Sequence, residues 1–142
     1  MFKRILLPID MNEESFAHKA LKVALHQTPS DGLELHVLTV IPGYNMPIVA
    51  SFFPEDTMKK ATEAVRVQLK EYVAKNIPSE IQVFLHIAMG DPYKEILKCC
   101  HSVDADLIVL QSHNPNITQT LIGSVASKVV EHAKVSVMVI RS

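Results

Sequence analysis

Polar and small residues that could bind an anionic ligand follow two apolar segments of the sequence. Asp10 comes directly after the apolar residues 2–9, and four polar residues, 111–114, come directly after the apolar residues 107–110. Gly123-Ser124 then precedes a stretch with helical periodicity. The free amides at a helix start suit a phosphate, and a carboxylate suits hydroxyl groups. These residue types indicate a binding site for a phosphorylated ligand.

Strand and helix patterns alternate along almost the whole chain. Apolar runs predict five strands, and amphipathic stretches beginning near Asn12, Glu55, Asp91 and Gly123 predict four helices. In the turn Gly90-Asp91-Pro92, we expect Asp91 to cap the third helix and Pro92 to open it. The predicted strands are residues 2–9, 33–41, 81–87, 107–110 and 135–140.

The alternation predicts an α/β fold with a doubly wound, five-stranded parallel sheet and helices on both faces. The first and fourth strands are apolar on both faces, which is typical of strands inside such a sheet. No repeat or composition shift divides residues 1–142, so we expect one domain. Ligands bind such sheets beyond the carboxyl ends of the strands, where the strand order reverses. We therefore expect Asp10, residues 110–114 and Gly123-Ser124 to lie together at the carboxyl edge of the sheet.

Composition excludes some function classes. The 142 residues carry 14 basic and 15 acidic side chains, a formal net charge of −1, which argues against binding to nucleic acid or an anionic membrane. Cys99 and Cys100 are adjacent, so a disulfide between them is not expected and a reduced compartment fits. We see neither a signal peptide nor an apolar run long enough to span a membrane, and expect a cytoplasmic protein.

Three stretches of the chain resemble the universal stress protein family, in the right order and over essentially the whole length: ILLPID, MGDP and DLIVLQSHNPNITQTLIGSVASKVVEHAKVSVMVIR. ATP-binding members of the family carry a loop of Gly, two residues, Gly, nine residues and Gly-Ser or Gly-Thr. Gly123-Ser124 match the end of this loop. Gln111 and Asn114 stand where the two earlier glycines are expected, and eight residues instead of nine separate Asn114 from Gly123. The segment SHNPNITQTLIGS is more similar to the filament-associated, F/G-like branch.

The resemblance implies a Rossmann-like strand order of 3-2-1-4-5 and an ATP or AMP site, with Mg²⁺ accompanying the nucleotide. In the family, the first-strand end borders the base and ribose, the second-strand backbone reads the adenine edge, and the fourth-strand end and the following helix start meet the sugar and phosphates. Carried over, these positions are Pro8, Ile9, Asp10, Val40, Leu110, Gln111, Ser112, His113, Asn114, Gly123, Ser124 and Val125.

Each of these assignments has a simpler structural alternative. Asp10 could cap the turn into the first helix, Gly123-Ser124 could be an ordinary helix start, and His113 could be a surface residue. Gln111 could fill the phosphate space or donate its side-chain amide to a phosphate oxygen. Asn114 tolerates a left-handed backbone and so could replace the missing glycine.

We interpret the chain as a nucleotide-holding stress-response protein with little or no catalysis. The segment between Gln111 and Gly123 has no lysine or arginine to stabilise a transferring phosphoryl group, and the Walker, dinucleotide and esterase motifs are absent. One alternative is a dimeric interaction module that has lost the nucleotide site. Another is a slow ATPase that orients water with Asp10 or His113.

The last predicted strand suggests self-association. An apolar strand at a sheet edge invites pairing with another copy, and family members commonly form homodimers through it. We expect a homodimer through Val135, Val137, Val139 and Arg141, together with an unidentified protein partner. The apolar, proline-rich residues 42–54 are either a lid over the ligand or part of the dimer contact.

Overall fold

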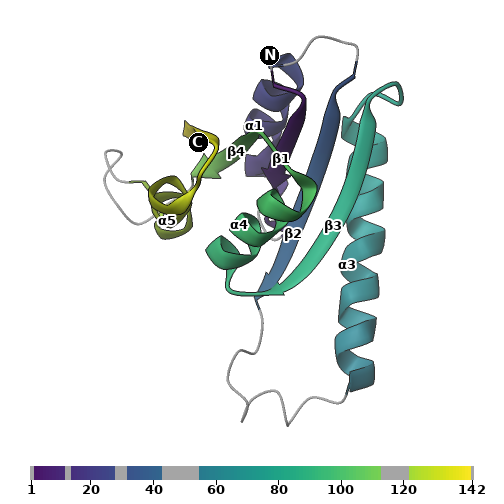
Figure 1. The fold of residues 1–142 in the computed structure, drawn as a ribbon. Helices are drawn as coiled ribbons and strands as arrows, with labels where there is room; N and C mark the ends of the chain where they lie inside the picture. The colour runs from purple at the N-terminus through teal and green to yellow at the C-terminus, as the bar shows by residue number, and fades with distance from the viewer. Residues whose placement is uncertain (1, 12–13, 28–31, 43–54, 113–121, 142) are drawn as a thin grey trace.

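The computed structural model describes residues 2–11, 14–27, 32–42, 55–112 and 122–141 (Figure 1). Its strands are β1 (Arg4–Pro8), β2 (Glu34–Pro42), β3 (Gln82–Gly90), β4 (Leu107–Ser112) and β5 (Ser136–Arg141). Its helices are α1 (Glu14–His26), α3 (Glu55–Asn76), α4 (Pro92–Val103) and α5 (Ser124–His132). The expected lid or dimer contact at 42–54 lies, apart from Pro42, outside the described residues. Within the described ranges, no helix has both the length and the apolar character needed to cross a membrane.

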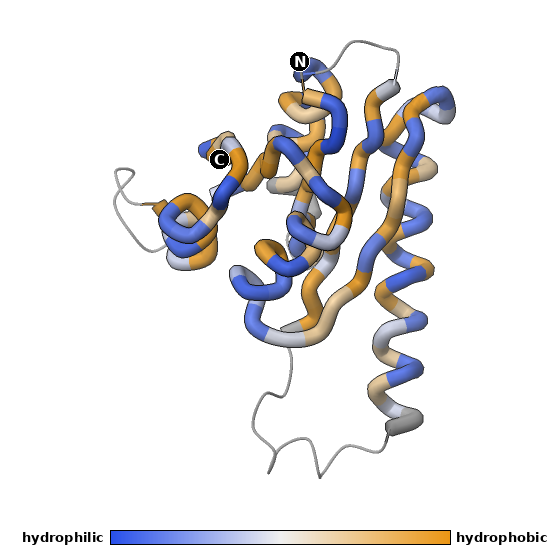
Figure 2. Tube along the Cα trace, viewed as in Figure 1, coloured by the Kyte–Doolittle hydropathy of each residue, from blue (hydrophilic) through white to orange (hydrophobic). Residues whose placement is uncertain are grey.

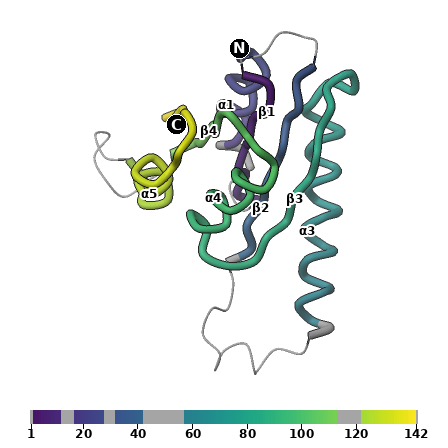
Figure 3. The backbone as a smooth tube through the Cα atoms, viewed as in Figure 1, coloured from purple at the N-terminus to yellow at the C-terminus, as the bar shows by residue number. Residues whose placement is uncertain are grey.

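The strands form one parallel sheet in the order β3-β2-β1-β4-β5, so the predicted fold class and strand order are confirmed. In register, Leu6 of β1 lies between His36 of β2 and Ile108 of β4. From β1 the chain winds outward through β2 to β3, then crosses back to β4 on the other side (Figure 3). The strand order therefore reverses between β1 and β4.

Helices cover both faces of the sheet, α1 and α3 on one and α4 and α5 on the other (Figure 1). In β1, Ile5 and Leu7 point toward α1 and α3, whereas Leu6 points toward α4 and α5. All three side chains are fully buried. Figure 2 colours most of β1 and β4 as hydrophobic, and the apolar residues of both strands are buried, as the sequence predicted.

The turn into α4 is built from backbone geometry more than from a side-chain cap. Asp91 occupies the cap position and Pro92 follows it, as predicted, but the Asp91 side chain makes no capping hydrogen bond. The Asp91 carbonyl instead accepts the backbone N–H of Glu95 at 3.0 Å. Gly90 has a φ of 150°, and a Cβ there would lie 2.9 Å from the Glu95 carboxylate, so glycine fits this position.

Charged groups hold the amino-terminal ends of the strands, at the edge of the sheet opposite to their carboxyl ends. The Asp106 carboxylate accepts the backbone N–H groups of Lys3 and Arg4 at 2.9 and 3.1 Å. The Arg4 guanidinium donates to Glu34 at 2.6 Å and to Asp104 at 3.3 Å. These bonds connect β1, β2 and the segment before β4.

Candidate functional site

A pocket of about 290 Å³ lies at the carboxyl edge of the sheet, at the switch point between β1 and β4. The ends of β1, β2 and β4 form its floor, and the first turns of α4 and α5 form its walls. The residues that line it are Pro8, Ile9, Asp10, Leu38, Val40, Pro92, Ile96, Leu110, Gln111, Ser112, Gly123, Ser124, Val125 and Ala126.

Ten of the twelve residues assigned to the nucleotide site line this one pocket, and their role in binding stays a prediction. His113 and Asn114 lie outside the described residues. Sequence reasoning missed Leu38 and Ala126, neighbours of assigned positions, and Pro92 and Ile96 from α4. The spacing of Pro92 and Ile96 places both on one face of that helix, which was the available signal.

The end of β1 is fixed by β2. The backbone N–H of Ile9 donates to the Leu38 carbonyl at 2.7 Å, and the buried Thr39 hydroxyl donates to the Ile9 carbonyl at 3.0 Å. Both bonds hold the segment that carries Asp10, whose exposed side chain lies at the pocket rim. Asp10 is the one charged side chain among the described residues that line the pocket.

The backbone of Val40 faces the pocket. β2 pairs with β1 only as far as Leu38, while its pairing with β3 continues to Pro42. Backbone groups of alternate residues point to the same side of a strand, and the Leu38 carbonyl points toward β1. The N–H and C=O of Val40 therefore point the same way, into the space beyond the end of β1, as an adjacent donor and acceptor.

The start of α5 presents an array of amides. Gly123 is the N-cap, and its own N–H donates to the Ser112 hydroxyl at 2.9 Å. The first intrahelical bond runs from the Ser127 N–H to the Gly123 carbonyl. Helix geometry therefore leaves the N–H groups of Ser124, Val125 and Ala126 without an intrahelical acceptor, directed at the pocket edge. These amides are suited to an anion, while Gly123 anchors the turn to β4.

Gln111 is held on the other face of the sheet. Its side-chain oxygen accepts the backbone N–H of Ala20 in α1 at 3.1 Å. Leu110 lies on the α4 and α5 side, and alternation along β4 places Ser112 there too. The two expected roles of the Gln111 side chain, filling the phosphate space or donating to a phosphate, stay predictions, and its oxygen is engaged by α1.

The cysteines have a structural environment. Cys100 is buried and Cys99 is half-buried, and both are free thiols. Burial, with smaller effects from Cys100 and Glu95, raises the pKa of Cys99 to about 11, so its thiol stays protonated at neutral pH. Burial also raises the pKa of Cys100. A thiol held protonated is a poor nucleophile and a poor metal ligand.

A doubly wound parallel sheet with a pocket at its switch point defines a Rossmann-like α/β protein. The model of the universal stress protein family matches residues 1–141. Universal stress protein G of Shigella flexneri is 31% identical over 147 residues, covering 99% of this chain and 100% of the relative. The chain belongs to the universal stress protein family.

Solved structures share the fold. The structure of a hypothetical protein, from a structure-based assignment of biochemical function, has a TM-score of 0.83 at 27% identity and covers 100% of this chain and 97% of that one. An Archaeoglobus fulgidus universal stress protein in complex with dAMP has a TM-score of 0.65 at 20% identity, covering 96% of both chains. A universal stress protein in complex with cAMP has a TM-score of 0.59 at 17% identity, covering 99% and 98%.

Proposed function

We propose that the pocket binds an adenine nucleotide, ATP or AMP, and that the chain acts in the stress response by holding it, with little or no catalysis. The observation that carries the proposal is the arrangement of three groups around one cavity. These are the outward-facing backbone of Val40, the Asp10 carboxylate and the free amides of Ser124, Val125 and Ala126.

Each of these groups suits one part of the nucleotide. An adjacent backbone donor and acceptor at Val40 complement the adenine edge, which also carries a donor beside an acceptor. The Asp10 carboxylate accepts hydrogen bonds from the ribose hydroxyls. The amides at the start of α5, with the helix dipole, bind phosphate oxygens.

The fold neighbours support adenine as the base. Two universal stress proteins of the same fold have structures in complex with dAMP and cAMP, both adenine nucleotides. The placement of Gln111 also favours binding over the alternative of a lost site. Its side chain is bonded to Ala20 in α1 and so does not close the phosphate end.

Magnesium would enter with the phosphates. Asp10 is the one carboxylate among the described lining residues, and Mg²⁺ in nucleotide sites is commonly held by one or two carboxylates, phosphate oxygens and water. The groups described around the phosphate end are neutral amides and a hydroxyl, which bind charge without providing a general base. We therefore propose that the nucleotide is retained. We also propose a cytoplasmic location, because Cys99 and Cys100 are free thiols, which a reducing compartment maintains.

We also propose a homodimer through β5, the edge strand beside β4. The side chains of residues 137–140 in β5 are half-buried, and those of Val137 and Val139 pack against the core beneath α5. An apolar edge strand with unpaired backbone groups is a surface for pairing with a second copy. The expected protein partner would bind this dimer.

Calorimetric titration of the full chain with ATP and AMP in the presence of Mg²⁺ tests the nucleotide site. Binding with a dissociation constant on the order of micromolar supports it, and no binding up to millimolar nucleotide contradicts it. Ser124→Glu puts a carboxylate in the first turn of α5, where it favours the helix but repels phosphate. We expect this change to weaken binding by more than about tenfold.

The matched control is Val130→Glu, a 47% exposed position on a different face of α5 from Ser124, with little expected effect on affinity. Phosphate release followed in the same samples tests retention. Turnover at a rate typical of enzymes, about 1 per second or faster, would contradict the non-catalytic account.

A further inference from the structure

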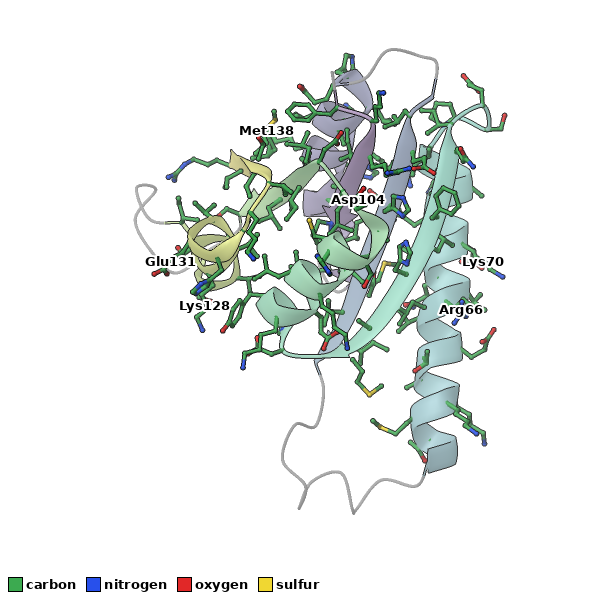
Figure 4. The ribbon with its side chains drawn as sticks, in the orientation of Figure 1. Arg66, Lys70, Asp104, Lys128, Glu131 and Met138 are labelled. Atoms are coloured by element: carbon green, nitrogen blue, oxygen red, sulfur yellow. The ribbon has the colours of Figure 1, made fainter. Side chains whose placement is uncertain are left out.

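A cation lies beside the candidate pocket, although none lies in the segment between Gln111 and Gly123. The ammonium group of Lys128 in α5 is 5.0 Å from the centroid of the Tyr93 ring in α4. Tyr93 directly follows Pro92, which lines the pocket, and its ring also stacks on His132 at 5.8 Å. Figure 4 labels Lys128 on α5, and its contact with Tyr93 joins the two helices whose first turns form the pocket walls.

Helix geometry directs Lys128 toward the phosphate end of the pocket. Lys128 follows Ser124 by four residues, so the two lie on neighbouring parts of one helix face, with a rise of about 6 Å between them. Side chains on a helix lean toward its amino terminus. In the structure the Lys128 ammonium lies over the Tyr93 ring, and rotation of its long stem brings it within reach of the amides of Ser124, Val125 and Ala126.

The present contact of Lys128 can be exchanged for a stronger one. Lys128 is exposed, and a cation–π contact at an exposed site is weak. A hydrogen bond between an ammonium and a phosphate oxygen is charge-assisted and stronger. The flexible stem of lysine allows the ammonium to leave the Tyr93 ring when a phosphate chain extends past the start of α5.

We propose that Lys128 binds the outer phosphates of the nucleotide and makes the pocket prefer a polyphosphate over a monophosphate. The inference rests on the proposed nucleotide site. In a pocket whose one charged lining residue is the acidic Asp10, each added phosphate increases repulsion unless a cation is near. Lys128 supplies that cation beyond the reach of a single phosphate held at the helix start.

The test is calorimetric titration of the full chain and its Lys128→Gln variant with ATP and with AMP, without added divalent cation so that the lysine contribution is not masked. We expect the variant to bind ATP about tenfold more weakly and AMP with less than about a twofold change. The wild-type preference for ATP should also shrink as salt concentration rises, because the contact is exposed.

Lys94→Gln is the matched control. Lys94 also lies near the Tyr93 ring, at 6.0 Å, but it is exposed on α4 on a different side from the buried Ile96, which lines the pocket. This variant removes the same charge and should leave the ratio of ATP to AMP affinity unchanged. The NMR signals of the Tyr93 ring give a second readout, since ATP should shift them as Lys128 departs and AMP should not.

The outcomes separate the two proposals. If the wild type binds both nucleotides and Lys128→Gln changes neither affinity, or weakens both equally, the role of Lys128 is wrong and the nucleotide site stands. If the wild type binds neither nucleotide, the site itself is wrong and the role of Lys128 falls with it.

Discussion

The side-chain oxygen of Gln111 accepts the backbone N–H of Ala20 at 3.1 Å, which joins the end of β4 to the middle of α1. Gln111 stands where the resemblance places the first glycine of the family's phosphate loop. Unlike glycine, glutamine has a long side chain, which would obstruct the phosphates if it pointed into the pocket. The hydrogen bond holds this side chain on the opposite face of the sheet from Ser112. Gln111 thus lines the candidate pocket while its side-chain oxygen holds α1.

Replacing Gln111 should affect stability more than binding. Gln111→Ala removes the acceptor of the partly buried bond to Ala20, and we expect the free energy of unfolding in urea to fall by about 1 kcal/mol. ATP affinity should change less than about threefold, a difference of under about 0.7 kcal/mol. Gln82→Ala, at an exposed position, is the control. A large gain in ATP affinity in Gln111→Ala would mean that the glutamine obstructs the site.

Ser112 should be needed for the conformation of the helix start. Its hydroxyl is the acceptor for the Gly123 N–H at 2.9 Å, and the residue is 8% exposed. Ser112→Ala leaves that N–H without its partner, which should cost about 1–3 kcal/mol of unfolding free energy and weaken nucleotide binding. Hydrogen exchange at the Gly123 amide should accelerate.

Ser102→Ala is the control for Ser112. The Ser102 hydroxyl bonds to the Lys98 carbonyl within α4 and is exposed, so its loss should cost less than about 0.5 kcal/mol. Equal losses of stability in the two variants, with unchanged exchange at Gly123, would contradict a specific role for Ser112.

The architecture could be predicted from sequence because the relevant signals are local. Apolar runs such as residues 2–9 and 107–110 mark buried strands, and their alternation with amphipathic helices fixes a parallel sheet and its switch point. The clustering of Asp10 with Gly123-Ser124 follows from that topology without any measured distance.

The parts that were missed depend on tertiary packing. Whether α4 reaches the pocket depends on how that crossover helix packs over β2, so Pro92 and Ile96 were not assigned. Alternation along β4 shows that Gln111 and Ser112 face opposite sides, but not which side holds the ligand. The cation Lys128 lies in α5, outside the segment between Gln111 and Gly123, which contains no lysine or arginine.

A pair of histidines makes the sheet sensitive to acid. His36 Nδ1 and His86 Nε2 are 2.9 Å apart, and the His36 ring stacks on Phe84 with 4.8 Å between centroids. One proton can lie between the two nitrogens, whereas two charged rings would repel each other. Burial lowers the pKa of both histidines, and the His86 charge lowers that of His36 further, while Glu34 raises it and Arg4 lowers it.

Stability should therefore fall in acid. The folded-state pKa values lie below the ordinary value of 6.5, so below that pH the unfolded chain takes up protons more readily than the folded one. The free energy of unfolding should decrease as pH falls from 6.5 toward the folded-state pKa values. Urea unfolding between about pH 7.5 and about pH 5 measures the slope. His86→Gln should reduce it, and a slope unchanged in that variant would contradict the assignment.

Dimerisation should depend on the β5 edge. Val139→Lys places a charge on this edge strand, and we expect the dimer to weaken by about tenfold or more, because edge lysines oppose strand pairing. Val67→Lys, at a 48% exposed position on α3, should leave the dimer intact. Analytical ultracentrifugation distinguishes the cases. A wild type that remains monomeric at about 100 µM protomer, or a Val139→Lys variant as dimeric as the wild type, would exclude pairing through β5.

The most direct test of the nucleotide site is an amide-resolved NMR titration of the full chain with ATP. We predict saturable shifts at the amides of Val40, Ser124, Val125 and Ala126, the groups that face the pocket. A second hollow, at the amino-terminal edge of the sheet, is lined by both basic and acidic residues and serves as an internal control for binding away from the proposed site. Shifts confined to that edge, or none at millimolar ATP, would contradict the proposed site.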